Sequence, residues 1–593
     1  MTKEIPHYDK PEEEQEYYKK LVELMDHYED GWNLLIKGHK QKDYDLPLPI
    51  KEEHKGNPYI PHSWLELADK VCQIIAVDKY ELDVYPNTIE IIRADQMLDA
   101  YTTTGLPDSY PHWSHGKRRM MEERDYDASK HLAYEIVINS DPCLAYCMDT
   151  NTPMMQMIVI AHANYGHNAV FKNNYLLKDV DAETILTENR RLRDFVIECE
   201  QKYGWREVSD FLDFCHAMKF IDTTEEPKRD PVRKSDMIKR ARDRQLAAHL
   251  NPPHKSVFNN SANDNSDAPK ELPGHPRRGE KNILAFMADE SPHMPQWKRD
   301  MMHMISRLSQ YFKPQISTKV LNEGMATFMD QHIMTTMRDI GLIDAAMYQE
   351  YGQDHKGVTY QPSAVRLVKD EDGNVHEQFV GASFNPYTLG WTILEDLKRI
   401  CMNPTEEDKE WFHFAGDPDW MSVVKHAVYS SSDETFIHQY LSPQAMRKLK
   451  MFTLETMEEK NMSEEQKALS KMYNVDFALV SAVQADEGFK RMREQLAKDY
   501  RMYEKIPNIT LHDYQSKTDR CLVLRHHIFE DQMLDPNDTK AVLEYMHSQW
   551  EHPVVLESVD EDGNVLDVYS SPPNYNHKLQ RQMSPQMSMS LRP

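Results

Sequence analysis

Two short segments, far apart in the chain, carry the side chains best suited to chemistry. His162 and His167 follow the nearly all-apolar run 154–161, and Glu323 lies in a second segment of mostly apolar and small residues. An imidazole or carboxylate buried in such surroundings costs roughly several kcal/mol unless it is paired or binds an ion. A lone buried histidine is more often a hydrogen-bonded core residue than a ligand. Two in one motif, with a carboxylate elsewhere, favour a site for a divalent metal ion.

The spacing of the two histidines is not the one that zinc hydrolases commonly use. The chain contains no His-Glu-x-x-His motif, in which residues four apart share one helix face. Residues five apart, such as His162 and His167, are separated by about 140° around an ideal α-helix. Both imidazoles can reach one ion only if Gly166 ends the helix or a bulge interrupts it. His216, next to Cys215, is a further candidate ligand.

Glu323 is the strongest single candidate for a metal ligand. The sequence Glu-Gly-Met-Ala at 323–326 resembles the Glu-Gly-Trp-Ala helix that supplies the third ligand in zinc peptidases of the gluzincin type. Gly324 lacks a side chain, so another helix or a substrate can approach the carboxylate. Asp330 lies seven residues further on the same helix face and is a second candidate ligand. The alternative is a Glu323 that caps a helix or forms an ion pair inside a helical bundle.

Three further residues are candidates for catalysis. Glu135 lies in a mostly apolar segment that we read as a helix, where a carboxylate is either paired or serves as a ligand or general base. His112 precedes Trp113 in a segment that either stacks against a substrate or forms a packed turn. Tyr387 follows Asn385 and a proline, a pattern typical of a helix start, and its side chain there can still line a pocket.

The elements that must position these residues are predicted to be mainly helices. Apolar residues recur with helical spacing through most of residues 1–505, and only 88–93 alternates like a strand before residue 220. The predicted organisation is a helical domain over 1–505, with a proline-rich linker or surface excursion at about 223–281 and a β-hairpin at about 365–380. A small C-terminal α/β domain over 506–570 and a disordered tail over 571–593 follow.

Composition excludes several classes of protein. With 593 residues and 40% apolar residues, the chain can form a large core and two to four domains. A net charge of -27 argues against general binding to nucleic acid or anionic membranes. No run approaches the roughly 20 apolar residues of a membrane-spanning helix. Seven scattered cysteines and the absence of an apolar leader lead us to expect a cytoplasmic protein.

Several long motifs together resemble one protein family. The motifs around the two histidines and Glu323, together with Tyr-Pro-His-Trp-Ser-His-Gly-Lys at 110–117 and Asn-Pro-Tyr-Thr-Leu-Gly at 385–390, are similar to those of the stage V sporulation protein R (SpoVR) family. The resemblance implies a bacterial or phage protein linked to formation of the spore cortex. It also implies a histidine at the position of Asp330, and partners that include a serine kinase and a von Willebrand-like protein.

Two functional hypotheses follow. In the first, the protein is a metal-dependent hydrolase of a peptide or amide bond. His162, His167 and Glu323 converge on one ion, with His216 or Glu135 completing the shell. Zinc is the expected metal, with manganese or iron as alternatives. In the second, the protein is a non-catalytic regulator that works with protein partners, and the same side chains form a structural polar network.

Overall fold

The computed structural model describes most of the chain outside residues 222–281. The described residues are 15–27, 62–103, 106, 109–127, 135–178, 180–221, 282–343, 345–362, 365–369, 375–379, 384–451, 453–456, 467, 477–480, 486–502, 506–514, 519–529 and 532–575. The predicted linker at 223–281 and the tail beyond residue 575 lie outside them. The chain divides into two compact units. Unit 1 comprises residues 1–212 and 307–506, and unit 2 comprises 213–306 and 507–593.

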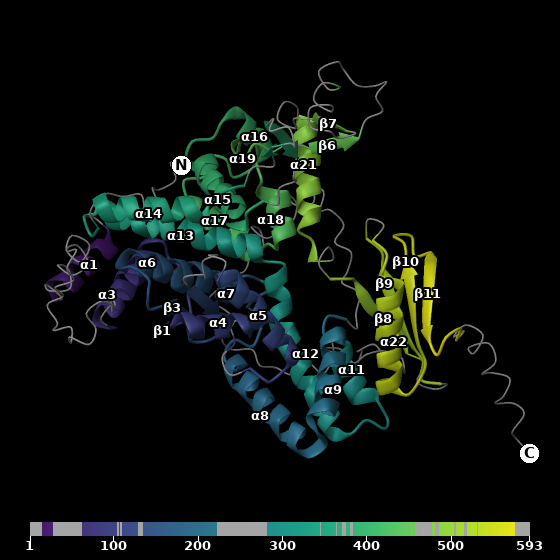
Figure 1. Ribbon diagram of the computed structural model, residues 1–593. Helices are drawn as coiled ribbons and strands as arrows, with labels where there is room; N and C mark the ends of the chain where they lie inside the picture. Colours follow the sequence, from purple (N-terminus) through teal and green to yellow (C-terminus); the bar gives the residue numbers. More distant parts are fainter. Residues whose placement is uncertain are drawn as a thin grey trace, which may run out of the picture. The chain divides into compact units, whose positions relative to one another are not determined.

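The elements are mainly helices, as predicted, with a small sheet near the C-terminus (Figure 1). The helices up to residue 218 are α1 (Glu16–His27), α3 (His62–Gln73), η4 (Ile74–Lys79), α4 (Ala94–Thr102), α5 (Trp113–Asp127), α6 (Pro153–Val159), η5 (Ile160–His167), α7 (Asn168–Asn173), α8 (Ile185–Tyr203) and α9 (Trp205–Met218). The later helices are α11 (Ile283–Glu290), α12 (Gln296–Ile316), α13 (Lys319–Asp339), α14 (Ala345–Val358), α15 (Pro386–Met402), α16 (Glu406–Trp411), α17 (Trp420–Tyr429), α18 (Asp433–Tyr440), α19 (Pro443–Lys448), α21 (Asp486–Asp499) and α22 (Pro536–Trp550).

Helix α13 forms the centre of unit 1. Most of its 21 residues are buried, and it contacts η5, α14, α15 and η4. A helix that is enclosed on nearly all sides must be apolar around its circumference, and α13 carries Met, Leu, Ile and Phe on every face. The polar side chains in its middle therefore lie within the core, whereas Lys319, Arg338 and Asp339 at its ends are exposed. The candidate Glu323 and Asp330 are both on this helix.

Three strands of unit 1 correct part of the sequence interpretation. The strands β1 (Asn87–Ile92), β2 (Glu135–Ile138) and β3 (Cys143–Met148) form a sheet in the order β1-β3-β2, with β1 and β3 parallel and β2 and β3 antiparallel. The strand-like alternation at 88–93 is confirmed. The prediction of helices throughout 123–220 is wrong at β2 and β3, so Glu135 lies on a strand. The central strand β3 is buried along almost its whole length, and a continuous apolar run does not distinguish such a strand from a buried helix.

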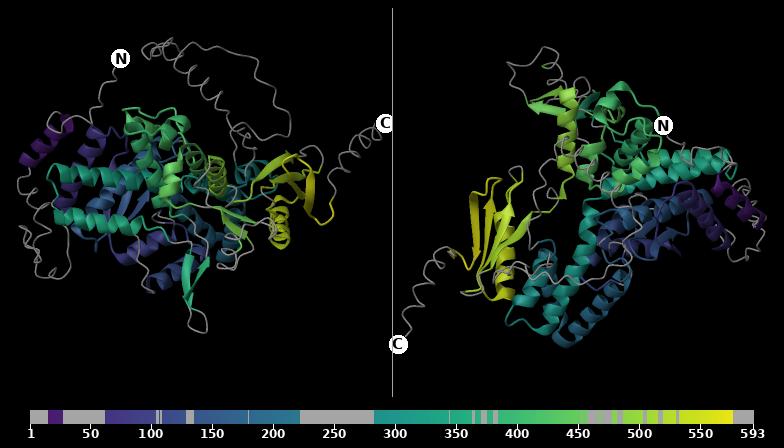
Figure 2. Two further views of the ribbon diagram at one scale, coloured as in Figure 1. Left: turned by 90° about the horizontal axis from the view of Figure 1, so that it is seen from above. Right: turned by 180° about the vertical axis from the view of Figure 1, so that it is seen from behind.

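The β-hairpin that was predicted at 365–380 is confirmed. Strands β4 (Val365–Lys369) and β5 (Val375–Phe379) pair in antiparallel register, with Val365 opposite Phe379. Figure 2 shows this hairpin extending away from the helices of unit 1. A second antiparallel pair, β6 (Thr453–Thr456) and β7 (Phe477–Val480), was not anticipated.

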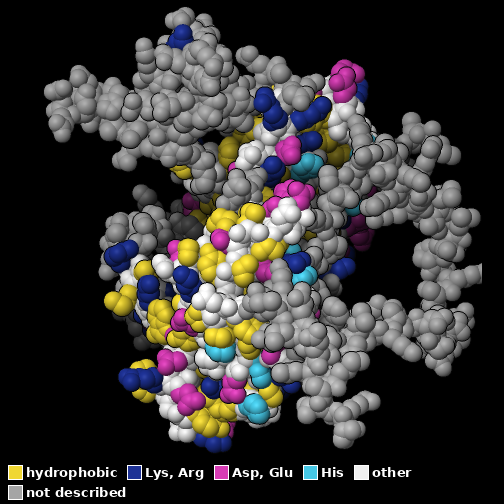
Figure 3. Space-filling model, turned by 90° about the vertical axis from the view of Figure 1, so that its right-hand side faces the viewer, with side chains coloured by type: hydrophobic (Ala, Val, Ile, Leu, Met, Phe, Trp, Pro, Cys, Tyr) yellow, Lys and Arg dark blue, Asp and Glu magenta, His cyan; other side chains and the backbone are white. Residues whose placement is uncertain are grey.

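Unit 2 contains a four-stranded sheet with its own core. Its strands β8 (Ile509–Tyr514), β9 (Leu522–His527), β10 (Val554–Val559) and β11 (Val565–Ser571) have the order β11-β10-β9-β8. Trp550 of α22 contacts Tyr514 of β8 and Phe286 of α11. The predicted C-terminal α/β arrangement is therefore present, and residues 213–306 group with it. On the face in Figure 3, charged side chains of both signs are interspersed over the described residues.

Two further features concern membrane-spanning helices and disulfide bonds. Among the described helices, none combines the length and apolar character that crossing a bilayer requires. All seven cysteines are buried and none is joined in a disulfide bond.

Candidate metal centre

The two histidines converge because the helix that carries them is not an α-helix. Residues Ile160–His167 form the π-helix η5, and the backbone N–H of Asn168 donates to the carbonyl of Ala163, five residues earlier. In a π-helix the hydrogen bond joins residues five apart, so side chains with that spacing point to the same side. The imidazole rings of His162 and His167 consequently lie 4.8 Å apart between centroids. This is the bulge that the spacing of the histidines required.

Glycines bring the three helices of the site into backbone contact. A Cβ added to Gly166 of η5 would lie 2.3 Å from Cα of Ala326 on α13. A Cβ added to Gly324 would lie 2.5 Å from Cα of Gly390 on α15. No side chain fits at either position, so the missing side chains set how closely η5, α13 and α15 approach. Glu323, next to Gly324, is thereby held against both the histidines and the start of α15.

The spacing of the three polar groups matches that of ligands around one ion. Oε2 of Glu323 lies 3.7 Å from Nε2 of His162 and 3.4 Å from Nε2 of His167. One ligand atom from each residue lies within 4.8 Å of the other two. Two ligand atoms that are each about 2.1 Å from a tetrahedral zinc ion are separated by roughly 3.4 Å. The arrangement has room for an ion between the three atoms.

Several polar atoms of these three residues lack hydrogen-bond partners among the described residues. Nε2 of His162, Nδ1 of His167 and Oε2 of Glu323 are all buried and form no hydrogen bond with a described residue. Leaving a buried polar atom unsatisfied costs about 1–3 kcal/mol, and more when the group is charged. An ion at the centre of the cluster would compensate His162 and Glu323 directly. The donor set of two imidazoles and one carboxylate is one that catalytic zinc sites use.

Asp330 fixes the orientation of His162. Its Oδ2 lies 2.9 Å from Nδ1 of His162. A carboxylate only accepts hydrogen bonds, so Nδ1 carries the proton and the opposite nitrogen, Nε2, faces Glu323. Burial acts to lower the pKa of His162, but the nearby carboxylates of Asp330 and Glu323 outweigh it and raise the pKa to about 10. Without an ion, the cluster therefore holds a proton that metal binding would displace. Asp330 itself lies outside the three-residue cluster.

Glu135 and Tyr387 border this cluster. Burial raises the pKa of Glu135, although the charges of His162 and His167 oppose the shift. The ring of Tyr387 stacks on that of His162, with centroids 6.0 Å apart and 24° between the planes. Burial, the charges of Glu323 and Glu135, and a hydrogen bond with Glu323 all raise the pKa of the Tyr387 hydroxyl. The predicted helix start is also present, since the Asn385 side chain accepts from the backbone N–H of Tyr387.

Two further predicted site residues, His216 and His112, also lie outside the three-residue cluster. His216 lies on α9 within unit 2, whereas the cluster belongs to unit 1. His112 precedes α5, where its Nδ1 lies 2.7 Å from Oγ of Ser114 and its ring packs against Trp113. Sequence reasoning missed Tyr351 and His355, which contact Asp330 on the side away from His162. Their spacing of four on α14 places them on one face, but nothing in it indicates which helix that face meets.

The rest of the histidine motif anchors η5 to its surroundings. Asn164 and Tyr165 both donate to the carboxylate of Asp69 on α3, at 3.1 and 2.8 Å. Asn168 bonds the backbone of Tyr85 through both its amide atoms. These contacts lie on faces of the helix away from the cluster and hold the π-helix in place.

Comparison with known proteins places the chain in a family. The model described as "SpoVR like protein" matches residues 62–505, and the model "SpoVR-like C-terminal domain" matches residues 507–561. The chain therefore belongs to the SpoVR family. It is 35% identical over 498 residues to the "Uncharacterized protein YcgB" of Escherichia coli (strain K12), covering 83% of this chain and 92% of that protein. No solved structure matches the chain.

Proposed function

We propose that the protein is a metal-dependent hydrolase whose ion is held by His162, His167 and Glu323. The observation that carries this proposal is the convergence of one ligand atom from each of these three residues within 4.8 Å of one another. Of these atoms, Nε2 of His162 and Oε2 of Glu323 are buried and form no hydrogen bond with a described residue. Three protein ligands with an open fourth position are the arrangement of catalytic rather than structural zinc sites. Zinc is the metal that this ligand set suits best, with manganese or iron as alternatives.

The neighbouring residues supply the other groups that hydrolysis requires. A bound divalent ion lowers the pKa of a water molecule and polarises the bond to be cleaved. Glu135, half-buried beside the cluster, is proposed to accept the proton of that water as a general base. Tyr387, whose ring stacks on His162, presents a hydroxyl that can donate to a developing oxyanion. His162 is held by Asp330 throughout.

A peptide or amide bond is the proposed substrate class. The segment Glu323-Gly324-Met325-Ala326 is similar to the ligand-bearing helix of zinc peptidases, and here it occupies the helix α13 that presents Glu323 to the histidines. The link to the spore cortex that the family resemblance implies agrees with this class.

Metal analysis tests the proposal directly. Protein purified without a metal-affinity tag should contain close to one equivalent of zinc, manganese or iron, and Glu323→Gln should lose most of it with its helical circular dichroism unchanged. Asp339→Asn is the matched control, because it removes a carboxylate from the same helix at an exposed position. If Glu323→Gln retains the metal content of the parent, Glu323 is not a ligand. Glu135→Gln should retain the metal and lose hydrolysis of a peptide-amide library.

Chelation separates the hydrolase from the structural alternative. His167→Ala strands the carboxylate of Glu323, so we expect a loss of about 1–3 kcal/mol of stability under either reading. In the hydrolase, a chelator should destabilise the parent by a similar amount and leave His167→Ala unchanged, because the ion joins η5 to α13. A parent protein that ignores chelators but is destabilised by His167→Ala would favour the non-catalytic role. The search would then turn to protein partners such as the serine kinase and von Willebrand-like protein.

A further inference from the structure

A chain of hydrogen bonds continues from the candidate metal centre into helix α14. Asp330 uses Oδ2 for His162, at 2.9 Å, and accepts from the hydroxyl of Tyr351 with Oδ1, at 3.0 Å. The Tyr351 oxygen in turn lies 3.1 Å from Nδ1 of His355. Asp330 and Tyr351 are buried, while the side chain of His355 is 15% exposed. The chain joins three helices, η5, α13 and α14.

The direction of each bond follows from the chemistry of the groups. The hydroxyl of Tyr351 has a single proton and donates it to the carboxylate, so the Tyr351 oxygen accepts the next hydrogen bond from Nδ1 of His355. Both oxygens of Asp330 are then occupied, one by α14 and the other by η5. The carboxylate cannot rotate without losing a buried hydrogen bond.

We infer that Tyr351 and His355 are positioning residues of the metal centre, which hold Asp330 so that His162 presents Nε2 to the ion. The inference rests on the proposed function and extends it to residues that do not touch the ion. Ligating histidines commonly donate their second N–H to a carboxylate, and loss of such outer partners typically reduces metal affinity by about 10- to 100-fold. Here the outer carboxylate, Asp330, is itself held by Tyr351 and His355.

The second histidine of the cluster shows what this support adds. Nδ1 of His167 is buried and has no hydrogen-bond partner among the described residues, and its ring stacks on Phe171 of α7, with centroids 6.0 Å apart. The two ligands are therefore held differently: His162 by hydrogen bonds that continue through Asp330 to Tyr351 and His355, and His167 by ring packing against His162 and Phe171. Loss of these hydrogen bonds should therefore disturb the position of His162 and leave that of His167 unchanged.

The test compares two tyrosines of the same helix. Tyr351→Phe removes only the hydroxyl that bonds Asp330. Tyr348→Phe removes a hydroxyl one turn earlier, which bonds Thr335 at 3.1 Å and has no contact with the cluster among the described residues. Zinc affinity is measured by competition with a chelator on the full-length protein, and the visible absorption of the cobalt-loaded protein reports the geometry around the ion. The melting temperature of the metal-free proteins monitors the fold.

We expect Tyr351→Phe to weaken zinc binding at least tenfold and to change the cobalt spectrum, whereas Tyr348→Phe should match the parent in both. Should Tyr351→Phe prove unstable, His355→Gln provides the second measurement, with an expected smaller loss in the same direction. Equal affinities and spectra for the two phenylalanine variants would overturn the positioning role while leaving the hydrolase intact, provided Glu323→Gln still loses the metal. A parent that binds no metal would overturn both.

Discussion

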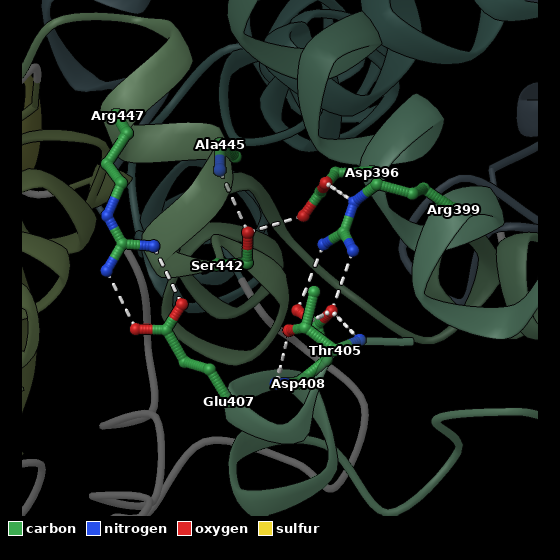
Figure 4. Close-up of polar contacts among 8 residues, drawn as sticks. All are labelled: Asp396, Arg399, Thr405, Glu407, Asp408, Ser442, Ala445 and Arg447. Atoms are coloured by element: carbon green, nitrogen blue, oxygen red, sulfur yellow. Dashed lines mark hydrogen bonds and ion pairs between the residues drawn. The ribbon is translucent and has the colours of Figure 1, made fainter. Parts of the chain in front are cut away.

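Two polar regions in the core of unit 1 differ in whether their polar groups are paired with other groups of the protein. In the candidate metal centre, three buried polar atoms have no hydrogen-bond partner among the described residues. In the second region, which we call the Arg399 network, Arg399 of α15 contacts Asp396 and Asp408, and Asp396 accepts from Ser442 (Figure 4). The Arg399 network joins α15, α16 and α19 without any open position.

The Arg399 network satisfies its own groups. Arg399 donates to both oxygens of Asp408, at 2.7 and 2.9 Å, and through Nε to Asp396 at 2.6 Å. Asp408 also accepts from the backbone and hydroxyl of Thr405, completing a capping box at the start of α16. Ser442 caps α19 by accepting from the backbone N–H of Ala445. Each charged group has a partner, so nothing about the network requires a ligand.

The comparison distinguishes polar groups with a structural role from polar groups that are arranged to bind a ligand. A polar group with a purely structural role can be fully compensated by its neighbours, as Asp408 is. Unsatisfied atoms that face one another at ligand spacing can be compensated by an ion that binds between them. Under the proposed function, the cluster of His162, His167 and Glu323 belongs to the second kind.

The largest effect is expected from a substitution in the Arg399 network. Arg399→Met keeps an unbranched side-chain stem but leaves Asp396 and Asp408 without their cation. Removing one partner of a buried ion pair is strongly destabilising, and we expect a loss of about 3 kcal/mol in urea unfolding. The loss should be the same with and without a chelator. A loss that depends on the chelator would mean that the two regions are coupled.

An intermediate effect tests how the metal centre is assembled. In Gly324→Ala, the new Cβ meets the backbone of Gly390, which cannot move aside as a side chain would. Overpacking of this kind costs about 1–3 kcal/mol, and separation of α13 from α15 should also weaken metal binding through Glu323. Gly352→Ala is the control, because this helical glycine has no neighbour within 4 Å of the added Cβ. The control should gain up to about 1 kcal/mol, and equal behaviour of the two variants would contradict the proposed contact.

The smallest effect is expected from His332, a buried histidine whose pKa is shifted in the opposite direction to that of His162. Burial lowers the pKa of His332 on α13 to about 3, and the charge of Lys398 acts in the same direction. Since the folded-state pKa lies below the unfolded value near 6.5, the unfolded state binds more protons, and the contribution of His332 is lost as the pH falls below that value. The stability difference between the parent and His332→Gln should shrink by roughly 0.7 kcal/mol from pH 7 to pH 6. A difference that grows would mean that His332 is protonated in the fold, as His162 is in the metal-free cluster.

The sequence predicted the mainly helical class, the β4–β5 hairpin and the core of the site. Glu323 and the two histidines were identified because charged or titratable groups in apolar segments need an explanation. Their convergence was foreseen only as a condition, since the spacing of five fails on an α-helix. Hydrogen-bond registers that differ by one residue leave no distinct trace in the pattern of apolar residues, so η5 itself could not be predicted.

Other features depended on tertiary contacts that the sequence does not encode locally. The run that contains Glu135 is apolar in a way that suits either a buried strand or a helix, and it was assigned to a helix. Asp330 was recognised as able to ligate a metal, whereas its position beside His162 depends on how η5 meets α13. The Arg399 network went unnoticed, because Arg399 and Asp408 lie in segments whose charge pattern is ordinary for exposed helices.

The π-helix makes the candidate centre depend on a count of residues as well as on their identity. The hydrogen bonds of a π-helix join residues five apart, whereas those of an α-helix join residues four apart. A π-helical turn therefore contains about one residue more. Deleting a single residue between His162 and His167 would allow a regular α-helix with the two histidines four apart, but the anchors Asn164 and Tyr165 that lie between them would be rotated by up to about 100°. Either the histidines or the anchors would then face the wrong neighbours. In this segment an insertion or deletion is therefore more damaging than most substitutions, and the length between the two histidines is part of the site.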